Sequence, residues 1–202
     1  MNIIINSTNI GKNLFIGYDI NITFLLTTPQ LHHLILFILV MVTKGFGGKI
    51  NDLAELMPVR HRTNFGKFLS KSPWDEKLLE RALKKYVLHQ IWNISKNIGN
   101  PIYVVIDDTI SEKTPPSSKA KRPTEKCGFH NSHLKGKTVY GHQLVTVMLS
   151  CGKLVLPFAM IIYDKTEMSK IQIAMEIIAS LPKPVKKGYV LCDSWYIVVV
   201  YK

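Results

Sequence analysis

Two acidic residues stand side by side where a strand-like run of the sequence stops. The stretch "YVVIDDTISE", residues 103–112, places Asp107 and Asp108 directly after β-branched and aromatic residues. Adjacent carboxylates repel each other, and a carboxylate drawn toward a core also loses hydration. A divalent metal ion is the usual charge that offsets both effects. Asp107 is therefore the first candidate ligand of a metal site.

A second strand-like run, "YVLCD", ends in Asp193. If the two runs are neighbouring parallel strands, their carboxyl ends meet at one sheet edge, where open α/β sheets bind ligands. Two carboxylates there would suit Mg²⁺ or Mn²⁺. With two such ions about 4 Å apart, one activates the attacking oxygen of a phosphodiester reaction and the other stabilises the leaving oxygen. The alternative is that each acid only caps a turn or a helix.

The elements that would position these acids follow one another as strand, strand, strand, helix and strand. Strand-like runs lie at 102–107, 141–150, 153–163 and 189–193, and a helix with Ile171, Ala174, Met175, Ile178 and Leu181 on one face lies at 167–181. Cys151 and Gly152 predict a hairpin between the second and third runs. Residues 111–137 hold seven Lys or Arg and few apolar residues, which predicts a long basic loop. The pattern favours an α/β domain with a mixed sheet over residues 100–202.

The first half of the chain has a helical pattern. Residues 1–27 stay unassigned, and 28–97 form an all-helical region whose first helix begins near Thr27 or Thr28. A short helix before Pro58 and a second one follow; the second would turn Phe65, Phe68 and Leu69 inward. Their basic outer face is typical of a helix-turn-helix that contacts DNA. Ordinary packing of a small helical bundle explains the same pattern.

Charge favours a polyanionic partner. The chain has 202 residues and a net charge of +12, from 26 Lys and Arg against 14 Asp and Glu. Such an excess indicates nucleic acid, although a generally basic protein is the other interpretation. Three widely spaced cysteines and the lack of a signal peptide predict a cytoplasmic protein. DNA as its partner would make it nucleoid-associated. The most apolar run, Leu34–Val42, is too short for a bilayer, so no membrane association is expected.

Three stretches together resemble the transposases of bacterial insertion sequences, in the DDE superfamily: "VVIDDT", "KTVYGHQLVTVMLSCGKLVLPFAMIIYDK" and "YVLCDSWY". The resemblance covers about residues 100–202. It implies a ribonuclease-H-like fold, Mg²⁺ or Mn²⁺ as cofactor, DNA ends and target DNA as partners, and a homodimer on DNA. It assigns Asp107 and Asp193 as catalytic metal ligands, while Asp108 need not ligate. The implied activity is DNA strand cleavage followed by strand transfer.

One element of that family's pattern is missing. The third carboxylate is a glutamate on a helix well beyond the second aspartate, whereas this sequence ends at Lys202. Glu167 and Glu176 fall on the earlier predicted helix and do not fit that place. We therefore expect the N-terminal portion of such an enzyme, with a sheet incomplete at its C-terminus and no strand cleavage by itself. The alternative is a non-catalytic DNA-binding remnant.

Further residues could bind metal or DNA. Cys127, His130 and His133 have a spacing that could hold zinc, but exposed or DNA-facing side chains are the preferred interpretation. His142 reads as a buried strand residue, and Tyr196 as packing rather than base stacking. An Asp-x-Asp-x-Thr phosphatase motif does not match Asp107-Asp108-Thr109. The DNA-binding candidates are Arg60, Arg62, Lys67, Lys119, Lys121, Arg122, Lys135 and Lys137.

Overall fold

A computed structural model gives the fold of most of the chain. It divides between Tyr86 and Val87 into two compact units, which are described separately. The division falls inside a helix, so the second half of that helix belongs with the sheet. The described residues are 26–45, 51–52, 55, 62–119 and 124–197.

Helix α2 (Thr28–Lys44) begins as the sequence predicts. Thr27 is its N-cap, and the backbone N–H of Thr27 donates to Oε1 of Gln30 at 2.8 Å. This capping box satisfies donors that the first turn leaves without helical partners. Gly45, with φ of +62°, ends the helix in a conformation that side chains disfavour.

Helix α4 (Arg62–Lys71) forms the core of the first unit with α2. Phe65 is completely buried beside Leu36 and Val40, and Phe68 is also buried. The prediction for Leu69 is wrong, because this side chain is 50% exposed. Since Phe65 and Phe68 already face α2, the next residue turns about 100° away. The short helix predicted before Pro58 lies mostly outside the described residues.

Helix α5 (Glu76–Ile98) connects the two units. Its buried residues are Val87, Ile91 and Ser95, all in the half that belongs to the sheet unit. Gly99 ends the helix with φ of +80°, and its N–H donates to the Ser95 carbonyl at 2.9 Å. The predicted break at residues 97–101 is thus confirmed.

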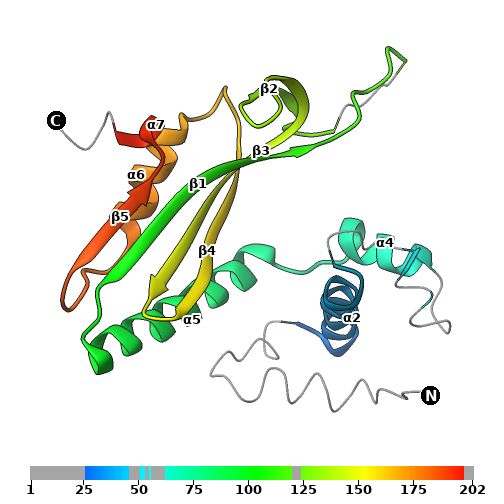
Figure 1. Ribbon diagram of the computed structural model, residues 1–202. Helices are drawn as coiled ribbons and strands as arrows, with labels where there is room; N and C mark the ends of the chain where they lie inside the picture. The colour runs from blue at the N-terminus through cyan, green and yellow to red at the C-terminus, as the bar shows by residue number, and fades with distance from the viewer. Residues whose placement is uncertain (1–25, 46–50, 53–54, 56–61, 120–123, 198–202) are drawn as a thin grey trace. The chain divides into compact units, whose positions relative to one another are not determined.

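The second unit is a five-stranded mixed sheet, so the α/β class and the order of its main elements are confirmed. β3 pairs with β1 on one side and with both β2 and β4 on the other, all antiparallel, while β5 pairs with β1 in parallel. Figure 1 shows β5 beside β1, and the hairpin of β3 and β4 on the other side of β1. The strands are β1 (Ile102–Glu112), β2 (Gly128–Ser132), β3 (Lys137–Cys151), β4 (Leu154–Tyr163) and β5 (Gly188–Cys192).

Two predicted boundaries around the basic loop are wrong. β1 does not stop at Asp107 but continues to Glu112, because its polar second half pairs with Gly141–Val145 of β3. The loop predicted over 111–137 also contains β2, which pairs with the beginning of β3. Residues 108–112 and 128–132 are too polar to be predicted as strands from their own sequence. Each becomes a strand because it pairs with β3.

Helix α6 (Lys170–Ser180) covers one face of the sheet. It begins later than predicted, because Ser169 is its N-cap and accepts from the backbone N–H of Gln172. The apolar face predicted for this helix is only partly right. Ala174 is buried as expected, but the other buried residues of the helix are Ile173 and Ile177. Met175 is 52% exposed. On the sheet, this helix-covered face includes the buried residues Ile102, Val104, Ile106, Val145, Val147 and Leu149.

The opposite face of the sheet, termed the open face, is half-exposed. Directly paired residues of adjacent strands share a face, so Tyr103, Val105 and Asp107 lie there with Thr146 and Met148. Tyr103 stacks on its β5 neighbour Tyr189 at 5.6 Å between ring centroids. The open face carries Asp107, the first predicted metal ligand.

Gly141 is required where three strands meet. It pairs with Glu112 of β1 and with Gly128 of β2, and a Cβ there would lie 2.3 Å from the Ser111 carbonyl oxygen. Gly141→Ala should therefore destabilise the sheet unit by about 1–3 kcal/mol, the usual cost of overpacking. Urea unfolding followed by circular dichroism measures this.

The matched control is Gly128→Ala on the partner strand. Its added Cβ would meet only the ring of His130, with Nε2 at an ordinary 3.5 Å and Cε1 at 3.9 Å. This variant should unfold at nearly the wild-type urea concentration. Equal destabilisation by both changes would show that the close approach at Gly141 is not the cause.

Candidate metal-binding site

The register of the two parallel strands places Asp107 and Asp193 next to each other. Ile106 of β1 pairs with Cys192 of β5, and the two aspartates are the next residues along their chains. Neighbouring strands lie about 4.8 Å apart, so the two backbones are close where β5 stops. Helix α7 (Ser194–Ile197) then begins directly after Asp193.

Each of these carboxylates is only half engaged. Oδ1 of Asp107 accepts the backbone N–H of Asp108 at 2.8 Å. Oδ1 of Asp193 accepts the Ser194 backbone N–H at 2.5 Å and its hydroxyl at 3.2 Å. Within the described part of the chain, Oδ2 of neither aspartate has a hydrogen bond, and both side chains are exposed. Two oxygens thus stay available to a cation.

Asp108 has a different environment, on the helix-covered face. Its Oδ2 accepts from Nε2 of Gln143 at 2.6 Å and pairs with Nζ of Lys170 at 2.7 Å. The Asp108 side chain is 23% exposed. No sequence pattern points to Lys170 as the partner of Asp108, because the two residues lie far apart in the chain and Lys170 is on the first turn of α6. These contacts neutralise Asp108 without a metal.

Lys170→Met should destabilise the sheet unit by about 1–3 kcal/mol, since it leaves a partly buried carboxylate without its cation. Thermal unfolding of Lys170→Met, Asp108→Asn and the double variant measures the coupling between the two residues. Lys126→Met is the control, because it removes an exposed pair with Glu167 and should change little. A double variant no more stable than Lys170→Met would contradict the prediction.

Tyr196 is buried near the three aspartates. The side chain is 5% exposed, in agreement with the predicted packing role, and its hydroxyl has no hydrogen-bond partner in the described structure. Burial raises the pKa of the Tyr196 phenol well above its ordinary value, and the negative charges of Asp108, Asp107 and Asp193 raise it further. The phenol therefore stays protonated at neutral pH, as a donor beside the carboxylates.

The predicted cysteine–histidine cluster does not come together. His130 is buried on β2, contrary to the exposed position preferred for it, and burial followed by the nearby Lys165 charge lowers its pKa. His133 is exposed in the turn after β2. Cys127 instead contacts His142, with Sγ and Nε2 3.2 Å apart. In the described ranges, no three His, Cys, Asp or Glu side chains converge as a metal-binding group.

The predicted DNA-binding residues have varied positions. Arg60, Lys121 and Arg122 lie outside the described residues. Arg62 is the first residue of α4, and Lys135 forms an ion pair with Glu112. Lys67, Lys119 and Lys137 are exposed and form no ion pair within the described residues.

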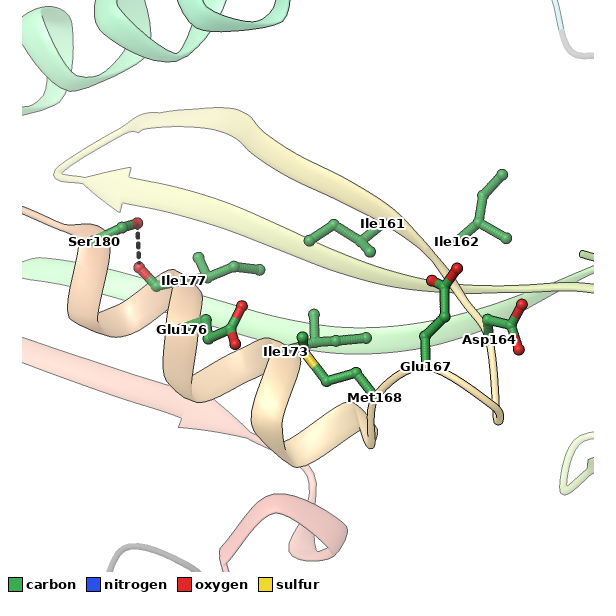
Figure 2. Close-up of a pocket in the computed structure, with 9 residues that line it drawn as sticks. All are labelled: Ile161, Ile162, Asp164, Glu167, Met168, Ile173, Glu176, Ile177 and Ser180. Atoms are coloured by element: carbon green, nitrogen blue, oxygen red, sulfur yellow. Dashed lines mark hydrogen bonds between the residues drawn. The ribbon is translucent and has the colours of Figure 1, made fainter. Parts of the chain in front are cut away.

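A pocket between β4 and α6 has a different character. Its volume is about 320 Å³, with an apolar floor and an acidic rim, and Figure 2 shows Ile161, Ile173 and Ile177 along its base. Glu176 projects from α6, whereas Glu167 lies in the turn before the helix rather than on it, which corrects the prediction. Carboxylates around an apolar floor repel phosphate, so this pocket does not suit DNA.

The geometry of the aspartate pair is thus the main functional evidence. No family model, no curated protein and no solved structure matches this chain. Among the helices of the described ranges, none combines the length and apolar character needed to span a bilayer.

Proposed function

We propose that Asp107 and Asp193 hold a divalent metal ion for DNA strand cleavage and strand transfer. The observation that carries the proposal is their adjacency on parallel strands, with an unengaged oxygen on each carboxylate. Carboxylate oxygens are the ligands that Mg²⁺ and Mn²⁺ prefer. Mg²⁺ sites commonly use one or two carboxylates, with water and substrate phosphates in the other positions. The donor set therefore fits such an ion.

A bound divalent ion would supply Lewis-acid stabilisation of charge on the reacting phosphate oxygens. The chain's own residues would divide the remaining tasks. Asp107 and Asp193 would fix the ion at the open face, while Lys170 and Gln143 hold Asp108 on the other face. The Tyr196 hydroxyl, protonated and without a partner, could donate to one of the ligating carboxylates.

DNA is the substrate that the charge distribution supports. A net charge of +12 favours phosphate backbones over small neutral substrates. The exposed lysines near the basic segment 111–137 add to this attraction. Assembly of two copies on DNA and a nucleoid location belong to the same proposal.

Iron-dependent affinity cleavage tests the site without requiring a complete hydrolytic centre. Fe²⁺ replaces Mg²⁺, and ascorbate with peroxide generates radicals that break DNA close to the bound ion. The proposal expects local strand breaks in an end-labelled duplex with the wild-type chain, and their loss in Asp107→Asn and Asp193→Asn. Breaks that are unchanged in the double variant would place the ion elsewhere.

A hydrolysis assay with Mg²⁺ or Mn²⁺ on the same duplex separates the two functional classes. Metal-dependent cleavage that EDTA and Asp107→Asn abolish supports an enzyme. Metal at the aspartates without cleavage is the result expected if the chain does not cut DNA by itself. Tight DNA binding with no metal at the aspartates, and no cleavage, would favour the non-catalytic DNA-binding alternative.

A further inference from the structure

The hairpin formed by β2 and β3 exposes an apolar residue at its turn. Leu134 is 100% exposed, the most exposed of the large hydrophobic residues described. The turn is ordered by hydrogen bonds from the Lys135 N–H to the Ser132 carbonyl and from the Gly136 N–H to the His133 carbonyl. A single exposed leucine is common on protein surfaces and indicates no function by itself. A functional role must therefore be argued from the residues around it.

A second apolar side chain lies on the same hairpin. Phe129 of β2 is 61% exposed and packs edge-on against Tyr140 of β3, with ring centroids 5.2 Å apart. This contact and the paired register from Gly128 to Ser132 stiffen the ribbon. Leu134 therefore stands at the end of a firm support rather than on a loose loop.

Lysines lie close to this apolar tip. Lys135 and Lys137 follow Leu134 in the chain, and both are exposed. Lys135 is engaged with Glu112, whereas Lys137 and Lys113 have no ion pair in the described structure. An apolar point with cations on its flanks matches proteins that push a side chain between base pairs while basic residues hold the phosphates. A two-stranded ribbon also has the width of a DNA groove.

We propose that the β2–β3 hairpin is a wedge that deforms duplex DNA, in which Leu134 inserts between adjacent base pairs and Lys137 and Lys113 contact the flanking phosphates. β3 continues from the hairpin to Thr146, the partner of Asp107. If the proposed function holds, the wedge and the metal site act on the same duplex.

The test measures binding of two 30-bp duplexes by the whole chain in EDTA, where the metal site plays no part. One duplex is fully paired, and the other has a central T·T mismatch beside 2-aminopurine, whose fluorescence rises on unstacking. Because a mismatch lowers the cost of unstacking, the wild type should bind this duplex about tenfold more tightly and raise its fluorescence. Leu134→Ala should bind both duplexes equally, close to the wild-type affinity for paired DNA, without the rise.

Control variants separate insertion from charge and from exposure. Lys137→Ala should weaken binding to both duplexes alike, and Val185→Ala, at a loop residue that is 60% exposed, should behave as wild type. The double variant Asp107→Asn/Asp193→Asn should keep the preference for the mismatched duplex. Loss of the metal site is thereby distinguished from loss of the wedge. The inference is overturned if the wild type binds neither duplex, if the wild type binds both duplexes equally, or if Leu134→Ala retains the preference for the mismatched duplex.

Discussion

Replacing Asp107 or Asp193 with asparagine should lower the affinity of the chain for Mn²⁺ by at least about tenfold, since each change removes one charged oxygen ligand. Electron paramagnetic resonance measures the effect directly, because free Mn²⁺ gives a strong signal that is lost on binding. The double variant should bind no more Mn²⁺ than a general surface acid does.

Asp108→Asn provides the sharpest control, because it makes the same chemical change one residue away. The Asp108 carboxylate is on the opposite face and is already held by Lys170 and Gln143. Mn²⁺ affinity should therefore stay within about twofold of wild type, since no ligand is lost. Circular dichroism confirms that each variant is folded. If Asp107→Asn and Asp108→Asn lowered Mn²⁺ affinity equally, the ion would be attracted by acidic residues in general. Asp107 and Asp193 would then not be its specific ligands.

The strand order around this site could be predicted from the sequence because its signals are local. Apolar runs mark each strand, and Cys151-Gly152 marks the β3–β4 turn, where Gly152 has φ of +61°. Once the order strand, strand, strand, helix, strand is given, β1 and β5 are expected as parallel neighbours. The structure has this pairing, with Ile106 opposite Cys192.

The contacts that distinguish the adjacent aspartates could not be predicted in that way. Whether Asp107 or Asp108 faces the helix depends on the register of β1 against β3, which pairs Asp108 with Val145. The ion pair with Lys170 joins two residues that are distant in sequence. Similarly, β1 continues beyond Asp107 only because β3 supplies hydrogen-bonding partners to a polar stretch. Long-range pairing, rather than local propensity, decides each of these features.

DNA affinity should fall steeply as salt concentration rises. If about five lysine or arginine side chains contact phosphates, the logarithm of the binding constant falls with a slope of about −4.5 against the logarithm of salt concentration. Raising the salt from about 50 to 200 mM should then weaken binding about 500-fold. Fluorescence anisotropy with a labelled duplex in EDTA measures this slope. The physical reason is release of condensed counterions, so the effect does not depend on DNA sequence.

Individual lysines then locate the contact surface. Lys119→Ala and Lys137→Ala, both at exposed positions of the basic segment 111–137, should each reduce the slope by about 0.9, because each removes one phosphate contact. Lys153→Ala is the matched control: Lys153 is also exposed, but it lies in the β3–β4 turn, at the other end of β3 from the β2–β3 hairpin. Its slope should equal that of wild type. If all three variants lowered the slope equally, DNA would be responding to the net charge of the chain, and the basic segment would not be the binding surface.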